Sequence, residues 1–183
     1  MDENEWEHIY RVKAGEQMPE PSALLQKHAH LLCGGTALDI AMGMGHNALF
    51  LARSGCRVTG VDRSTAAVTF AHDQAAAAGL PVNAVEADML GFPFSEDGYD
   101  VITNFYFLER SLLPLIKKNL KKNGLVFFET YTRKQARFGR PRNPDHLLET
   151  NELLSAFLDC LIVFYHERIE EDRAVASLIA RKL

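Results

Sequence analysis

The sequence has little of several features that mark whole classes of protein. It contains three cysteines in 183 residues, and this odd, widely spaced set indicates neither a disulfide framework nor a zinc site. We expect Cys33, Cys56 and Cys160 to be buried, reduced thiols of a cytoplasmic protein. Basic residues are not in excess, because 20 Lys and Arg face 24 Asp and Glu. This balance argues against a nucleic-acid partner.

Long hydrophobic runs are also missing, and none approaches the ~20 residues that span a bilayer. We therefore expect no membrane partner. The acidic opening segment MDENEWEHIY is expected to be neither a signal peptide nor a transit peptide. Histidines and cysteines form no metal-ligand cluster in the sequence, so no metal is predicted.

A hydrophobic fraction of 47% and a charged fraction of 24% are ordinary for a globular domain. Residues 1–21 are polar and contain two prolines, which predicts a loosely structured N-terminal arm. Residues 22–183 are expected to form a single domain. A polar, turn-rich stretch near 132–148 predicts a lid-like insertion in that domain.

Strand and helix patterns alternate from residue 22 onward. Strands are predicted at 36–40, 56–62, 81–88, 99–107 and 125–131. Helices are predicted at 23–32, 47–54, 65–78, 111–120 and 150–158. The segments 160–173 and 174–183 then read as an antiparallel hairpin. The pattern predicts an α/β fold with a doubly wound, mainly parallel seven-stranded sheet and a C-terminal antiparallel hairpin.

The loop that follows the first predicted strand carries the clearest chemical signal. Asp39 ends that strand, and Gly43 and Gly45 allow the backbone to turn sharply and to approach a ligand. Two further carboxylates, Asp62 and Asp88, follow the next two strands. Ligands of doubly wound sheets bind at the carboxyl ends of the strands. Three strand-end carboxylates therefore predict a site for a nucleotide-like ligand that carries positive charge.

Other interpretations of these residues remain open. GMGHNA matches the G-x-G-x-x-G/A formula of dinucleotide-binding folds, but Asp39 lies four residues before Gly43, which suggests a longer loop. The glycines alone are typical of many loops. Asp62 alone is also explained as a cap of the following helix, and Asp88 alone as a turn residue.

The stretch LDIAMGMGHNALFLARSGCRVTGVDRS resembles motif I and its sequel in class I S-adenosylmethionine-dependent methyltransferases, whose usual pattern is D/E-x-G-x-G-x-G. It looks closest to the small bacterial tellurite-resistance-type enzymes. The resemblance covers residues 22–183 and implies a Rossmann-like methyltransferase fold with S-adenosylmethionine as cofactor. Position 41 departs from the pattern because alanine replaces glycine, a change that we expect to be tolerated if φ is negative there.

The resemblance also implies roles for single residues. It places Asp39, Ala41, Gly43 and Gly45 around the methionine part of the cofactor. It places Asp62 on the ribose hydroxyls, and Asp88 on the adenine amino group with Met89 beside the ring. Further implied cofactor-binding residues are Met42, Asn47, Arg63 and Asn104.

The function predicted from these features is methyl transfer to a small-molecule acceptor. A dinucleotide-binding oxidoreductase is one alternative, although 183 residues leave no room for a separate substrate domain. A non-catalytic cofactor-binding partner subunit is another, because Ala41 departs from the pattern and no catalytic residue stands out. A general base is needed only if the acceptor loses a proton.

The acceptor side is less specific. TNFYFLER shares Asn104 and Tyr106 with the N-P-P-Y signature of amino-methylating enzymes but lacks both prolines. The insertion suits an anionic substrate, with a solvated loop as the alternative; its cations are Arg133, Lys134, Arg137, Arg140 and Arg142. The remaining substrate or lid candidates are Tyr10, Arg11, His46 and Tyr131. The sequence does not indicate an oligomeric state.

Overall fold

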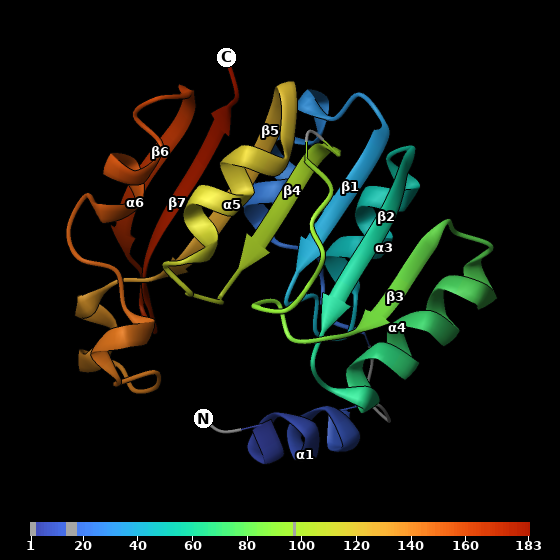
Figure 1. The fold of residues 1–183 in the computed structure, drawn as a ribbon. Coiled ribbons are helices and arrows are strands. Elements are labelled where there is room, and N and C mark those ends of the chain that lie inside the picture. Colours follow the sequence, from blue (N-terminus) through green and yellow to red (C-terminus); the bar gives the residue numbers. More distant parts are fainter. Residues whose placement is uncertain (1–2, 14–17, 97) are drawn as a thin grey trace. The chain divides into compact units, whose positions relative to one another are not determined.

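A computed structural model describes residues 3–13, 18–96 and 98–183 of the chain. The chain divides into two compact units, Met1–Pro93 and Phe94–Leu183. Each unit is a set of hydrogen-bonded strands with helices packed on them, as the ribbon in Figure 1 shows.

The first unit contains three parallel strands in the order β3-β2-β1. Its strands are β1 (Gly35–Ile40), β2 (Cys56–Asp62) and β3 (Val82–Glu86). Its helices are α1 (Glu3–Lys13), α2 (Ala23–Lys27), the 3-10 turn η1 (Ala29–Leu31), α3 (His46–Arg53) and α4 (Thr65–Ala78). Helix α3 packs on β1 and β2, and α4 packs on β2 and β3.

Local signals explain where α4 begins and ends. The Ser64 hydroxyl accepts a hydrogen bond from the amide of Ala67, which satisfies one of the free N–H groups of the first turn. Gly79 ends the helix in the left-handed conformation, with φ of 62°. The sequence predicted both ends of this helix, and the structure confirms them.

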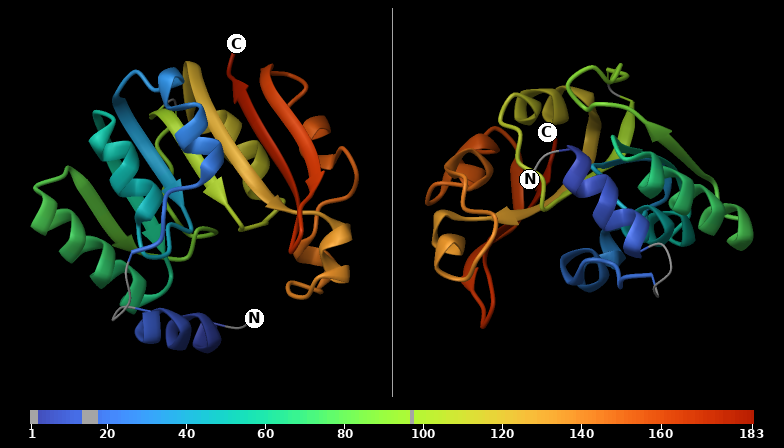
Figure 2. Two further views of the ribbon diagram at one scale, coloured as in Figure 1. Left: turned by 180° about the vertical axis from the view of Figure 1, so that it is seen from behind. Right: turned by 90° about the horizontal axis from the view of Figure 1, so that it is seen from below.

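The second unit contains four strands in the order β4-β5-β7-β6. Its strands are β4 (Tyr99–Phe105), β5 (Leu120–Tyr131), β6 (Leu161–Ile169) and β7 (Ala174–Arg181). Its helices are α5 (Leu112–Asn119), the 3-10 turns η2 (Arg133–Arg137) and η3 (Pro144–His146), and α6 (Glu152–Ala156). Strands β4 and β5 are parallel, whereas β7 is antiparallel to both β5 and β6. Figure 2 shows β5, β7 and β6 side by side.

The seven strands form the mainly parallel sheet with a C-terminal antiparallel hairpin that the sequence predicts. Three local expectations were wrong. The N-terminal arm contains helix α1, and the helix predicted over 23–32 is interrupted at His28. The strand predicted at 125–131 begins earlier, at Leu120, and its added residues form an irregular part of β5 in which Asn123 has φ of 66°. Pairing between β4 and β5 is shifted there.

The three cysteines are free, but one of them departs from expectation. Cys56 and Cys160 are buried, whereas Cys33 is exposed because it follows η1 at the surface of the first unit. Within the described residues, no helix combines the length and the apolar character that crossing a membrane requires. No group of three or more His, Cys, Asp or Glu side chains in that part of the chain is arranged to hold a metal ion.

Candidate functional site

The loop between β1 and α3 has an unusual backbone. Ala41, Gly43 and Gly45 all have positive φ, at 51°, 53° and 80°. Such angles are readily available to glycine but cost an alanine about 1–2 kcal/mol. The negative φ under which the alanine was expected to be tolerated is therefore not present, and the methyl group at this position carries a conformational cost.

Each of the two glycines also sits where a side chain would collide. A Cβ on Gly45 would lie 2.7 Å from the Cβ of Ala71 on α4. A Cβ on Gly43 would lie 2.8 Å from the hydroxyl oxygen of Tyr10. The loop is thus shaped by close packing as well as by its turn.

Asp62 connects this loop with the end of β2. Its carboxylate is 7% exposed and accepts two backbone hydrogen bonds, from the Gly43 amide at 2.8 Å and from the Ser64 amide at 2.9 Å. Burial raises the pKa of Asp62, and the two amide donors act in the opposite direction. Ser64, not Asp62, provides the side-chain cap of α4.

Asp39 and Met42 lie on the buried side of the same loop. The Asp39 side chain, at the end of β1, is 1% exposed. The amide of Met42 donates to the carbonyl of Val61 on β2, which ties the loop to the neighbouring strand. A Cβ on Gly60 would collide with the sulfur of Met42, so a glycine in β2 makes room for this side chain.

The end of β3 is more open. The Asp88 side chain is 58% exposed and lies 4.0 Å from the guanidinium of Arg63. It also accepts a hydrogen bond from the Leu90 amide at 3.0 Å, which is the geometry of a turn residue. Met89 beside it is buried. The turn interpretation of Asp88 is therefore confirmed, and one carboxylate oxygen remains at the surface for Arg63.

Asn47 and His46 begin α3. The side-chain oxygen of Asn47 accepts from the amide of Ser22 at 2.8 Å, so this buried residue holds the segment before α2. Its amide nitrogen lies 3.3 Å from a ring nitrogen of His46. His46, one of the substrate or lid candidates, is half-buried.

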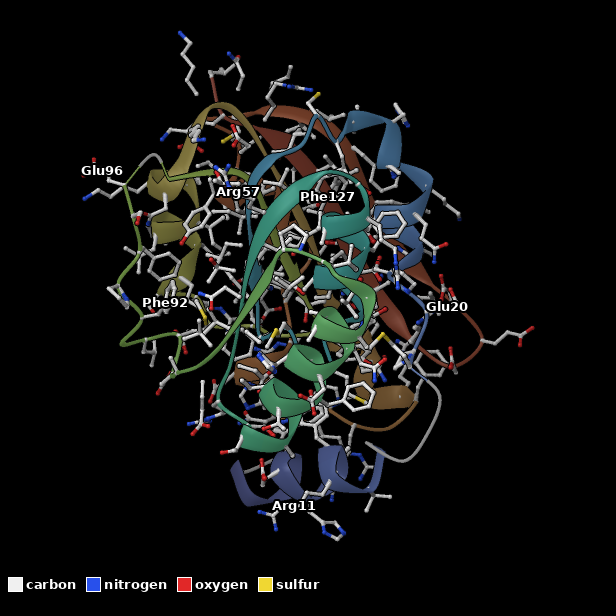
Figure 3. All side chains as sticks on the ribbon, turned by 90° about the vertical axis from the view of Figure 1, so that its right-hand side faces the viewer. Arg11, Glu20, Arg57, Phe92, Glu96 and Phe127 are labelled. Carbon is white, nitrogen blue, oxygen red and sulfur yellow. The ribbon has the colours of Figure 1, made fainter. Side chains whose placement is uncertain are left out.

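Helix α1 carries two lid candidates, Tyr10 and Arg11, and their side chains have different surroundings. Tyr10 packs against the loop beside Gly43, and burial together with the charge of Asp62 raises its pKa. Its hydroxyl is therefore protonated at neutral pH. The side chain of Arg11 is 72% exposed, pairs with Glu7 at 3.1 Å, and extends away from α4 in Figure 3.

In the second unit, Tyr106 follows β4 and Tyr131 ends β5, with ring centroids 5.1 Å apart. Tyr106 has φ of 57° and is fixed at both ends by Glu129. Its amide donates to the Glu129 carbonyl, and its hydroxyl donates to the Glu129 carboxylate, both at 2.8 Å. Arg173 donates to the same hydroxyl at 3.3 Å. Burial is the main cause that raises the pKa of both tyrosines.

Glu129 is the centre of a buried polar cluster that joins three strands. Its second oxygen accepts from the Ser177 hydroxyl on β7 at 2.5 Å and from the Arg168 guanidinium on β6 at 3.0 Å. A carboxylate that is 4% exposed is stable only with such partners. The cluster therefore fixes the position of the tyrosine hydroxyl.

The remaining candidates are Asn104, two residues before Tyr106, and Arg137 and Arg140 in the insertion after β5. Asn104 is buried in β4, and its amide donates to the carbonyl of Phe107 at 2.7 Å. Within the insertion, buried Gln135 bonds the carbonyl of Arg140 and the amide of Ala174. Arg137 and Arg140 are exposed. The insertion is thus a folded segment, anchored by hydrogen bonds, with cations on its surface.

Comparison with known proteins finds several methyltransferases similar to this chain. A family model described as "Methyltransferase domain" matches residues 37–124. The chain is 43% identical over 82 residues to a protein named Hemagglutinin 1 from Eikenella corrodens, covering 43% of this chain and 27% of that protein. It is 32% identical over 124 residues to the ubiquinone biosynthesis O-methyltransferase of Pasteurella multocida, covering 60% and 51%. Residues 37–124 thus match a methyltransferase domain, and the matches together support a class I S-adenosylmethionine-dependent methyltransferase.

Structural comparison gives this methyltransferase the same fold assignment. The structure of TehB from Haemophilus influenzae matches with a TM-score of 0.76 and 20% identity, covering 97% of this chain and 67% of that chain. At that identity the likeness shows the fold. The chain spans about half the length of the ubiquinone-biosynthesis relative that it matches.

The groups around the loop fit the cofactor that defines the family. Two buried carboxylates, Asp39 and Asp62, suit a ligand with cationic and hydroxyl groups. The sequence did not reveal Glu7, Glu129, Arg168 or Ser177. The hydrogen bonds that join Glu7 to Ser64, and Arg168 and Ser177 to Glu129, span 57, 39 and 48 residues, so no local pattern marks these residues.

Proposed function

We propose that this methyltransferase transfers a methyl group from S-adenosylmethionine to a small-molecule acceptor. The observation that carries the proposal is the position of Asp62. A single buried carboxylate holds both the glycine loop and the start of α4. That arrangement places a carboxylate beside the glycine loop at the strand ends, where doubly wound folds bind nucleotides.

The proposed cofactor contacts follow from the chemistry of these groups. Asp62 accepts hydrogen bonds from the ribose hydroxyls, and the Asp39 carboxylate offsets positive charge at the methionine end. Asp88 and Met89 meet the adenine ring. The cofactor supplies an electrophilic methyl group on a sulfonium. The protein then has to hold the acceptor in line at ~3 Å, which contributes several kcal/mol to the rate by itself.

The acceptor is proposed to bind near Tyr106 and Tyr131. The two rings offer aromatic surface, the Arg173 guanidinium is partly exposed, and Arg137 and Arg140 add positive charge on the insertion. These groups suit a small acceptor that is aromatic or anionic. A relative whose name specifies ubiquinone biosynthesis supports hydroxylated aromatic acceptors. A cytoplasmic location belongs to the same proposal.

A transfer assay tests the proposal. Labelled S-adenosylmethionine is incubated with the protein and a panel of phenols, carboxylates and soft chalcogen anions, and labelled product is counted. We expect transfer to at least one class, and a higher KM for that acceptor in Tyr106→Ala than in the exposed control variant Leu158→Ala. Binding of the cofactor without transfer to any acceptor would instead favour a non-catalytic partner subunit.

A further inference from the structure

Helix α1 has one side that faces the cofactor loop. Trp6 and Tyr10 lie one helical turn apart and stack with ring centroids 5.5 Å apart. Glu7 lies beside them and is largely covered, whereas Arg11 is exposed. Figures 1 and 2 both show α1 lying at the N-terminal end of α4, and the two helices are in contact.

Glu7 makes the polar contact between these helices. Its carboxylate accepts from the Ser64 hydroxyl at 2.6 Å and from the Ala66 amide at 3.3 Å. The first amides of a helix have no partner within the helix, and a negative charge is favourable there. Glu7 thus acts as an additional cap for α4, although it lies 57 residues before Ser64 in the chain.

The residue that Glu7 contacts leads directly to the cofactor loop. The Ser64 amide donates to one oxygen of Asp62, and the other oxygen accepts from the Gly43 amide. An unbroken path of hydrogen-bonding groups therefore runs from Glu7 to Gly43. Tyr10 reaches the same glycine by packing against it. Helix α1 contacts the loop system at two separate points.

We propose that Glu7 is a positioning residue for cofactor binding, which docks α1 on Ser64 and so holds Tyr10 over the glycine loop. The proposal rests on the assignment of S-adenosylmethionine as the cofactor. Docked α1 and the ordered loop stabilise the same arrangement of Asp62. By linkage, cofactor binding then strengthens the docking of α1, and loss of docking weakens cofactor binding by the same factor.

The chain offers a direct reporter, because Trp6 is its single tryptophan. S-adenosylhomocysteine, which lacks the reactive methyl, serves as the probe. Its Kd is measured by calorimetry for wild type, Glu7→Ala, Glu7→Gln and His8→Ala. Quenching of Trp6 fluorescence by acrylamide is measured with and without the probe, and circular dichroism checks that each variant is folded.

We expect Glu7→Ala to raise the Kd about tenfold, the size of a lost capping interaction. Glu7→Gln keeps an oxygen that accepts from Ser64 and should stay within about threefold of wild type. His8→Ala, an exposed position on the same helix, should leave the Kd unchanged. In wild type, the probe should protect Trp6 from acrylamide.

Two results would overturn the proposal while leaving the cofactor assignment intact. One is wild-type affinity in a folded Glu7→Ala variant. The other is wild-type protein that binds the probe with no change in Trp6 quenching, a result that needs no variant. Failure of wild type to bind the probe at all would contradict the proposed function itself, and the proposal for Glu7 with it.

Discussion

At the scale of single residues, the most informative position is Ala41. The family pattern has glycine there, and this chain keeps the backbone that glycine would favour, with φ of 51°. The fold therefore tolerates the methyl group without changing the loop. Position 41 shows that a motif can retain its conformation while one of its residues departs from the usual type.

Replacing Ala41 by glycine should remove this cost. We expect Ala41→Gly to raise the free energy of unfolding by about 0.5–1 kcal/mol, because relief at positive φ exceeds the added freedom of the unfolded chain. The matched control is Ala76→Gly on the exposed side of α4, which should lower stability by about 1 kcal/mol. Urea denaturation measures both, and equal signs for the two would contradict the argument.

The Glu129 cluster gives a second residue-scale prediction. Arg168→Met leaves a buried carboxylate without its cation and should cost about 3–5 kcal/mol. Arg133→Met breaks a pair whose partner, Glu149, is well exposed, so it should cost less than about 1 kcal/mol. The free energies of unfolding of the two variants are obtained from the midpoints and slopes of their urea denaturation curves and compared. Similar losses would mean that Glu129 does not depend on Arg168.

At the scale of elements, α3 and α4 meet where Gly45 faces Ala71. Gly45→Ala combines positive φ with a collision and should lower the free energy of unfolding by about 2–4 kcal/mol. Gly79→Ala has a similar φ but no atom within 4 Å of the added carbon, so it should cost about 1–2 kcal/mol. The difference between these losses measures the close approach of the two helices. No difference would show that the contact is loose.

Docking of α1 should depend on pH through Glu7. Its hydrogen bond from Ser64 is the largest cause that lowers its pKa below the ordinary value. The docked state is therefore favoured above about 4.3, the pKa of an unperturbed glutamate, and this preference is lost as pH falls through the lowered value. Asp62, whose pKa is raised by burial, also titrates as the pH falls, and Arg11 pairs with Glu7 on the same helix.

The comparison of wild type with Glu7→Gln isolates that titration, since Asp62 and Arg11 are common to both proteins. Trp6 fluorescence, recorded from pH 7 to pH 3, should show a release of α1 in acid that is present in wild type and reduced in Glu7→Gln. Identical profiles would assign the change to another group. Circular dichroism separates release of α1 from global unfolding.

At the scale of the whole molecule, the periodicity of hydrophobic residues and the capping and turn residues between them predicted most of the fold. Strand β2 was predicted to the residue, because its alternating pattern is bounded by Gly55 and Ser64. Helix α1 was missed, since its stability comes from contacts with α4 that its own polar sequence does not reveal. The φ of Ala41 and the partners of Glu129 were missed for the same reason, because both depend on tertiary packing.

The central claim is that the loop and Asp62 bind S-adenosylmethionine. Calorimetry with S-adenosylhomocysteine and with NAD tests it most directly, on wild type, Asp62→Ala and the exposed control Asp73→Ala. We predict that wild type and Asp73→Ala bind S-adenosylhomocysteine and not NAD, and that Asp62→Ala loses at least about tenfold in affinity. Absence of S-adenosylhomocysteine binding by wild type, or equal affinity in Asp62→Ala, would contradict the account.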